Sequence, residues 1–285
     1  MNKKSKKVLP LVRKPDFNFD NLDIHYLNNN PVATHFINSL HMIFPDGEKY
    51  FIRSVKAFSH KITDPELQER VRAFISQEAQ HMNAHKKLWE KLKEQSIAAD
   101  LFLRFYNYTS FELIEPFTRK FLGDEFPLAV TAALEHYTAV MAEVALYDNG
   151  EILRDVPLEM KNMLLWHAAE EIEHKAVAYD VYEEVQGSYP IRVAGMIYAT
   201  FLLSFYTFLG QAMFMGFDRS INWFDIKDQT ERFGTRTKPL FEGVFKNLFE
   251  YFQIDFHPDN RDNSKLSDEF LKDFSSDLSK KVVNN

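Results

Sequence analysis

The feature that most constrains the fold is a set of carboxylate and imidazole side chains spread over four separated stretches of the chain. Two stretches contain a glutamate followed three residues later by a histidine, and each is preceded by a single glutamate, 30 residues upstream in the first case and 36 in the second. Residues three apart lie on one face of a helix, so each pair can bind one ion. In chain order the set is Glu48, Glu78 with His81, Glu135, and Glu171 with His174.

The intervals within this set predict helices that pack beside one another. Each interval is long enough for a helix, a turn and the return of an antiparallel partner. A glutamate from each of two helices and a Glu-x-x-His pair from each of two others is the pattern of dimetal carboxylate sites in ferritin-like bundles. The sequence therefore predicts an all-α fold, a ferritin-like four-helix bundle with additional flanking helices.

The candidate ligands interrupt apolar stripes. Phe51 and Val55 follow Glu48 at helical spacing, and Phe74 precedes Glu78 by about one turn. An unpaired buried carboxylate is destabilising, so acids in such positions are expected to neutralise one another around cations. We therefore predict a bound dimetal centre, against the alternative of buried polar networks or surface charge.

The residue types limit the metal and its ligation. The chain contains no cysteine, so only carboxylates and imidazoles are available, a set that favours two transition-metal ions, Fe first, with Mn or Zn as alternatives. We expect one histidine on each ion, Glu48 and Glu135 as terminal ligands, and Glu78 and Glu171 as bridges. Four neighbours are candidates for extra ligands or for hydrogen-bond partners of the ligands. They are His85, His136, His167 and Glu170.

Composition divides the chain into four parts. Residues 1–30 form an irregular N-terminal arm to which no chemistry is assigned, residues 31–190 the metal-binding bundle, residues 191–217 a long apolar helix, and residues 218–285 a helical extension with a polar tail.

Breaker residues predict the helices within the bundle. Residues 31–44 form a short helix or a strand-like entry, broken at Pro45–Gly47, so that a helix begins at Glu48. The next helix starts at Thr63–Pro65, and residues 96–121 form a crossover helix that ends near Pro116 or Gly123. A third ligand helix runs from Leu128 to Asn149–Gly150, and a fourth from Pro157 through Val181.

The stretch from Val193 to Phe217 contains no charged residue. About 20 apolar residues suffice to cross a bilayer, but a helix packed against a bundle also reads as apolar on all sides. The sequence leaves open whether this helix docks on the bundle or associates with a membrane.

Charge and motifs exclude several classes of protein. A net charge of -7 disfavours general nucleic-acid binding. The basic run at Lys3–Lys7 has no apolar stretch behind it, so we expect a cytoplasmic or cytoplasmic-membrane-associated protein that is not secreted. Zincin, nucleophile-elbow, P-loop and dinucleotide-binding motifs are absent.

Four segments together resemble the bacterial family labelled predicted metal-dependent hydrolases. They are FPDGE at 44–48, QEAQHMNAH at 77–85, LEH at 134–136 and WHAAEEIEHK at 166–175. The resemblance spans roughly Pro31 to Phe217. It implies a metal centre built from Glu48, Glu78, His81, His85, Glu135, His167, Glu171 and His174.

Three functions are compatible with this pattern. The first is O₂-dependent oxidation of a hydrophobic small molecule by a di-iron centre, since carboxylate-bridged iron supplies electrons and a Phe-rich interior excludes water. The second is metal-dependent hydrolysis, which the family label implies. The third is a non-catalytic metal-binding bundle. We favour the first and expect a small hydrophobic substrate, with the oligomeric state left open.

Overall fold

The computed structural model describes residues 9–147 and 153–283, and this part of the chain is all-α with no strand. The lysine run at positions 3–7 and the predicted helix end at Asn149–Gly150 lie outside the described residues. The main helices are α1 (Pro31–Phe58), α2 (Pro65–Gln95), α3 (Ile97–Asn107), α4 (Glu115–Leu122), α5 (Glu125–Tyr147), α6 (Leu158–His174), α7 (Val177–Glu184), α8 (Tyr189–Phe217), α9 (Ile226–Leu248) and α10 (Ser264–Val283). Short turns of helix are η1 (Ser59–Lys61), the π-helical η2 (Tyr108–Ile114), η4 (Phe249–Phe252) and η5 (Pro258–Asn260).

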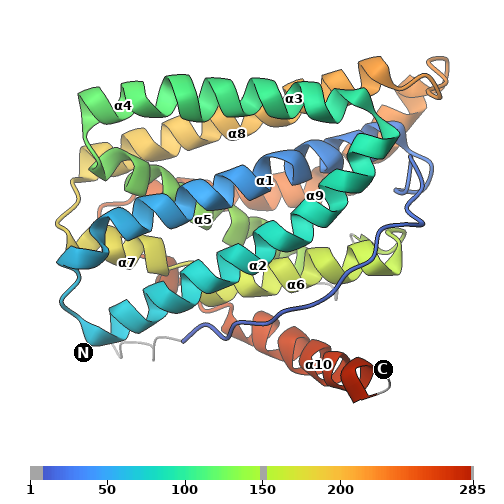
Figure 1. Cartoon of the computed structure of the whole chain (residues 1–285). Helices are drawn as coiled ribbons and strands as arrows, with labels where there is room; N and C mark the ends of the chain where they lie inside the picture. Colours follow the sequence, from blue (N-terminus) through green and yellow to red (C-terminus); the bar gives the residue numbers. More distant parts are fainter. Residues whose placement is uncertain (1–8, 148–152, 284–285) are drawn as a thin grey trace.

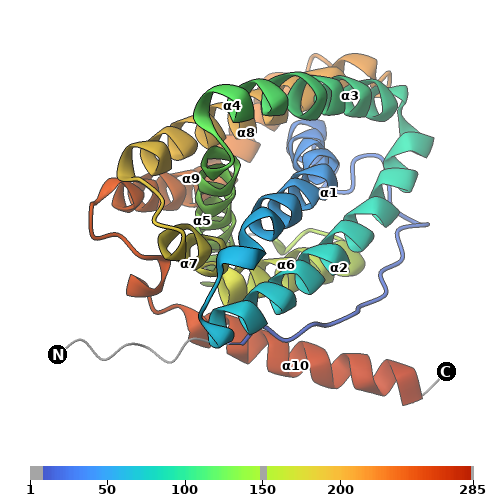
Figure 2. The ribbon, with the colours of Figure 1, turned by 60° about the vertical axis from the view of Figure 1, so that its left-hand side comes forward.

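Four helices form the centre of the bundle (Figure 1). The antiparallel pair α1 and α2 packs against α5 and α6, while α8 covers α1 and α5 on one side. Figure 2 shows α3 and α4 on the same side of the molecule as α8, and α10 on the opposite side. The all-α bundle predicted from the sequence is confirmed.

The apolar core is divided by a polar layer. One cluster of buried side chains includes Met42, Leu88 and Trp166, and the other includes Phe51 and Phe74. On both α1 and α2 the candidate ligands lie between residues of the first cluster and residues of the second. The polar layer is therefore enclosed by apolar packing at both ends.

The prediction that residues 31–44 are separated from a helix starting at Glu48 is wrong. Helix α1 begins after Asn30, whose side chain accepts from the Ala33 amide at 3.0 Å, and continues through Pro45. Proline has no N–H to donate to the carbonyl four residues earlier, which is that of His41. The indole Nε1 of Trp89 on α2 donates to this carbonyl at 3.0 Å instead. The partner that makes Pro45 tolerable comes from another helix.

The predicted fourth ligand helix is also interrupted. Helix α6 ends at His174 and α7 starts at Val177, so the stripe through Val181 is not one helix. Nζ of Lys175, between the two helices, donates to the Arg261 carbonyl at 2.6 Å. This contact fixes the chain directly after the last candidate ligand.

The crossover between α2 and α5 is helical, as predicted. It ends at Leu122, with Gly123 at a φ of 76°, a left-handed conformation that glycine adopts without strain. Pro116 does not end it, because η2 continues into α4 without a break and Pro116 lies just after this π-helical turn.

The long apolar stretch forms α8, which lies along the bundle. A Cβ on Gly195 would lie 2.9 Å from the Ala129 carbonyl carbon, and one on Gly210 would lie 2.7 Å from Cβ of Ser39. Glycine at these positions lets α8 approach α5 and α1 closely. By length and composition α8 could cross a membrane, but 33% of its apolar window is buried inside the protein.

Candidate metal centre

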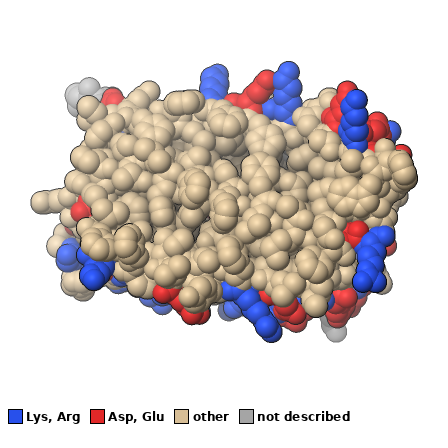
Figure 3. Space-filling model, turned by 90° about the horizontal axis from the view of Figure 1, so that it is seen from above, with Lys and Arg blue, Asp and Glu red and all other residues tan. Residues whose placement is uncertain are grey.

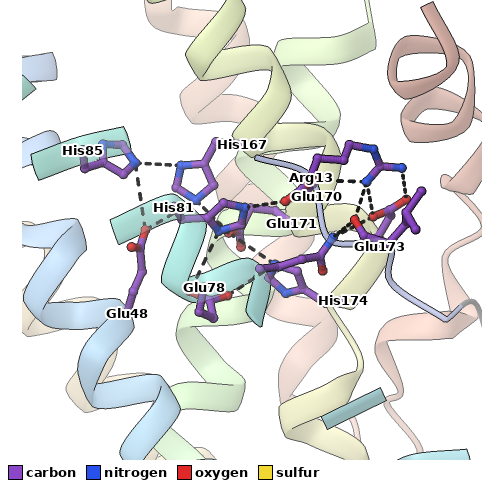
Figure 4. A network of polar contacts seen from close by, with 12 residues as sticks. Arg13, Glu48, Glu78, His81, His85, His167, Glu170, Glu171, Glu173 and His174 are labelled. Atoms are coloured by element: carbon purple, nitrogen blue, oxygen red, sulfur yellow. Dashed lines mark hydrogen bonds and ion pairs between the residues drawn. The ribbon is translucent and has the colours of Figure 1, made fainter. Parts of the chain in front are cut away.

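The structure brings the six predicted ligands together in the polar layer, all of them buried. Figure 4 labels all of them except Glu135. Glu48 comes from α1, Glu135 from α5, and the two Glu-x-x-His pairs from α2 and α6. The intervals between them in the sequence correspond to four neighbouring helices, as expected.

The two Glu-x-x-His pairs interlock. Nε2 of His174 lies 3.3 Å from Oε1 of Glu78, and Nδ1 of His81 lies 3.5 Å from Oε1 of Glu171. Within the first pair, His81 Nδ1 and Glu78 Oε2 are 4.0 Å apart. Each histidine is thus nearer to the carboxylate of the other pair than to its own, and the four residues offer ligand atoms all within 4.8 Å of one another.

Glu48 lies in a second group with His85 and His167, whose ligand atoms are also within 4.8 Å of one another. Nε2 of His167 is 3.6 Å from Oε1 of Glu48 and 2.8 Å from Oε1 of Glu171. Glu171 therefore connects the two groups. His85 and His167, which the sequence predicts as extra ligands or as hydrogen-bond partners of the ligands, therefore lie at the centre.

Glu135 contacts one candidate ligand, through the 2.9 Å contact between its Oε2 and Nδ1 of His174. Glu78 and Glu171, by contrast, both lie between His81 and His174. The terminal roles expected for Glu48 and Glu135 and the bridging roles expected for Glu78 and Glu171 stay predictions.

Burial sets the charge state of these groups. It raises the pKa of Glu48 and Glu78 well above the usual range, with further repulsion from the neighbouring carboxylates, and raises that of Glu135 to about 7. For Glu171 burial acts in the same direction, but the imidazoles around it lower its pKa below the usual range. Burial would lower the pKa of His174, yet Glu135 and Glu171 raise it to about 9. Bound cations would allow all four acids to ionise.

The residues fit a metal centre by a second criterion, the hydrogen bonds that their atoms do not make. Within the described part of the chain, several buried polar atoms at the centre have no hydrogen-bond partner, although such atoms are normally paired. They are both carboxylate oxygens of Glu48 and Glu78, Oε1 of Glu135, Oε2 of Glu171, Nδ1 of His81 and Nε2 of His174. These are the atoms with which the residues would coordinate ions.

The N-terminal arm contributes a residue that sequence reasoning missed. Nη1 of Arg13 donates to Oε1 of Glu170 at 3.1 Å, and both terminal nitrogens of Arg13 bind Glu173. The other oxygen of Glu170 lies 3.0 Å from Nε2 of His81. Glu170 thus orients the far side of the His81 ring, as carboxylates do for metal-bound histidines. The arm has no helical periodicity that would have indicated this role.

A second missed residue is His41 of α1. Its Nδ1 lies 2.8 Å from Nδ1 of His85, and Nε2 of His85 lies 2.8 Å from Nδ1 of His167. With one proton on each neutral ring, every bond in this row can be satisfied if the protons point toward Glu171. Burial lowers the pKa of His41 to about 3, so its ring is neutral. His41 lies seven residues before Glu48, a spacing that places both on one face of α1, but the helix break expected at Pro45 hid this relation.

His136 is not brought to the centre. Its Nε2 is 3.3 Å from the Asn247 carbonyl, and its ring packs against Tyr251 and Phe256. The next residue on a helix is rotated by about 100°, so His136 points away from the face that carries Glu135. Its inclusion among the candidates is therefore wrong.

Two cavities reach the centre. The α8 cavity, about 100 Å³, extends from Glu48 and Glu171 to Tyr106, Leu202 and Leu203, and its wall is mainly apolar. The α9 cavity, about 430 Å³, lies between α1, α5, α6 and α9. Residues that line both cavities are Phe44, Thr138, Met141, His167 and Glu171.

Comparison with known proteins gives one match. Residues 11–262 match the model of a family described as "Predicted metal-dependent hydrolase". The match extends beyond the 31–217 range of the resemblance seen in the sequence and includes most of the N-terminal arm and α9. No curated protein and no solved structure matches the chain.

Proposed function

Since the chain belongs to this family of predicted metal-dependent hydrolases, we propose that it is a metal-dependent enzyme that hydrolyses a hydrophobic substrate. The observation that carries the proposal is that eight potential ligand atoms of one centre are buried without hydrogen-bond partners, and that an apolar cavity ends on that centre. A non-catalytic bundle would not need such a cavity.

We propose that the centre holds two transition-metal ions in a ferritin-like bundle. The ligands would be Glu48, Glu78, His81, Glu135, Glu171 and His174, while His85 and His167 would stay in the hydrogen-bonded row beside Glu48. When bound, such ions polarise an ester, amide or phosphate group and lower the pKa of a bound water toward neutrality. Carboxylate and imidazole donors accept Fe, Mn or Zn.

The protein's own side chains would orient the reaction. Glu170 and Arg13 hold the His81 ring in one orientation, and the row of histidines ending at His167 can accept or return a proton at Glu171. The apolar wall of the α8 cavity excludes water and favours the apolar part of a substrate.

Metal loading and anaerobic turnover test this proposal. Purified protein loaded with Zn or Mn is expected to hydrolyse members of a panel of apolar esters without O₂, and Glu78→Gln is expected to lose metal and activity together. Glu90→Gln, on the exposed side of the same helix, is the control and should keep both. Full turnover by metal-free protein would contradict the proposal.

O₂-dependent oxidation is the second candidate, and one observation favours it. The donors come from four helices in the arrangement of ferritin-like di-iron sites, with two Glu-x-x-His pairs and two single glutamates. In that case bound iron would supply electrons for the reduction of O₂, which would in turn oxidise the substrate. O₂ uptake by Fe(II)-loaded protein with apolar substrates, and no anaerobic hydrolysis, would favour this reaction over the first.

A further inference from the structure

The side of the molecule formed by α3, η2, α4 and α8 carries an extended apolar surface, here called the apolar face. On α8 its exposed side chains are Ile197, Phe201, Phe205 and Phe208. On α3 and α4 they are Leu101, Phe105, Phe117 and Phe121. Monomeric soluble proteins rarely expose contiguous apolar patches larger than a few hundred Å². A helix of the length of α8 alone extends about 43 Å.

Charged residues are arranged around this face and not across it. Seen from this side, the centre of the molecule is free of Lys, Arg, Asp and Glu, and both signs of charge occur at the rim (Figure 3). Helix α8 has no charged residue between Arg192 and Asp218, and Arg192 is buried. An uncharged centre with a mixed rim fits an apolar partner better than a charged one.

We infer that the apolar face docks on a lipid bilayer, with α8 lying in the plane of the interface. One side of α8 is packed on α1 and α5 through Gly210 and Gly195, so the helix cannot cross the bilayer while the bundle is folded. Its other side is available to lipid. Apolar surfaces of proteins that bind one side of a membrane are buried at the boundary between headgroups and acyl chains.

The loop after α8 supports a lipid partner. In Figures 1 and 2 this loop, residues 218–225, lies at the end of the same side of the molecule. It presents Trp223, which is 56% exposed, and Phe224, which is 98% exposed. Tryptophan is enriched at membrane interfaces because its ring is apolar and its N–H is polar. A phenylalanine held fully in water is unfavourable unless a partner covers it.

The α8 cavity extends from the candidate metal centre toward this face. Leu202 and Leu203 line the cavity, while their neighbours Phe201 and Phe205 are exposed on the apolar face. A hydrophobic substrate dissolved in the bilayer would therefore be separated from the centre by one layer of side chains. If a second copy of this chain occupied the face instead, it would cover this layer and block that approach. This last step rests on the proposed function, whereas membrane binding does not.

Vesicle flotation tests the inference. The metal-loaded protein is expected to float with phosphatidylcholine vesicles, and Phe201→Glu/Phe208→Glu is expected to reduce the bound fraction at least tenfold. Because the rim carries both signs of charge, phosphatidylglycerol or added salt should change binding little. The control is Tyr147→Glu/Leu158→Glu, two exposed residues near the junction of α5 and α6, which should bind like the wild type.

Fluorescence gives an independent measurement. Trp89 and Trp166 are buried, so Trp223 is the exposed one of the three tryptophans. Vesicles should shift the emission to the blue, and Trp223→Phe should abolish this shift. Phe117→Glu, on α4, serves as a second face variant, with circular dichroism and metal content showing that each variant folds.

Three results would overturn the inference. They are no flotation of the wild type, equal flotation of the face variants, and a wild-type dimer in light scattering that the face substitutions dissociate, which would identify a second copy as the partner. Turnover of the panel of apolar esters in vesicle-free solution separates the two proposals. If it persists while vesicle binding is absent, membrane docking is refuted and the proposed function stands. If it is absent while vesicle binding is present, the proposed function fails and the docking inference stands.

Discussion

The bond between Trp89 and the His41 carbonyl gives a quantitative prediction, because Pro45 created the need for it. Trp89→Phe removes the donor that replaces the missing proline N–H. The carbonyl of His41 then remains buried without a partner. Pro45→Ala supplies a backbone N–H to the same carbonyl and should remove most of this effect.

The magnitude follows from the contribution of one hydrogen bond. An unsatisfied buried acceptor destabilises a protein by about 1–3 kcal/mol. Trp89→Phe also removes buried indole surface, whether residue 45 is proline or alanine. The surface contribution cancels in a double-mutant cycle, because both backgrounds lose the same side chain. We therefore expect Trp89→Phe to lower the free energy of unfolding by about 1–2 kcal/mol more beside Pro45 than beside alanine at position 45.

The assay is urea unfolding of the four metal-free proteins, followed by circular dichroism. Equal slopes of free energy against urea would show that the proteins unfold by the same transition. A coupling energy below about 0.5 kcal/mol, the limit within which independent sites add, would refute the reasoning that Trp89 replaces the proline N–H.

Three further predictions concern the centre and its surroundings. Glu171→Gln should reduce the metal content by at least one ion per chain, measured by elemental analysis, because Glu171 connects both groups of ligands. Arg13→Ala should weaken metal binding about 10–100-fold in a chelator competition, since Arg13 holds the Glu170 carboxylate that orients His81; unchanged affinity would show that the arm does not act on the centre. Burial lowers the pKa of His136 to about 4. As the pH falls below 6.5, His136 is therefore protonated in the unfolded chain before it is protonated in the folded one. The free energy of unfolding that this residue contributes above pH 6.5 is lost as the pH approaches 4. The loss attributable to His136 is about 3 kcal/mol, and urea unfolding of His136→Gln between pH 7 and 4 should show a smaller decrease than the wild type.

Helical periodicity was sufficient to predict the bundle and the convergence of six polar side chains. Spacing along one helix determines the face on which a residue lies, so Glu78 with His81 and Glu171 with His174 could be assigned to the interior without coordinates. The same argument could not determine which groups meet across helices. That each histidine lies nearer to the other pair's carboxylate is a property of packing between α2 and α6.

The features that the sequence did not predict have a common physical origin: each depends on a hydrogen-bond partner distant in sequence. Pro45 reads as a helix breaker because the local rule counts only its missing N–H, and Trp89 is 44 residues away. Arg13 lies in a segment without periodicity, yet it reaches Glu170 across 157 residues. The end of α6 at His174 likewise coincides with a contact between Lys175 and a carbonyl of residue 261. None of these bonds leaves a local pattern.

The residues shared by the two cavities have a consequence for how reactants meet. Phe44 packs edge-on against His85 and His167 while lining both the α8 cavity and the α9 cavity. A molecule arriving through the α8 cavity and another arriving through the α9 cavity would reach the same donors from different walls, without either having to pass the other. The Phe44 ring would then lie between the two access routes, and its size would limit how far each reactant can enter.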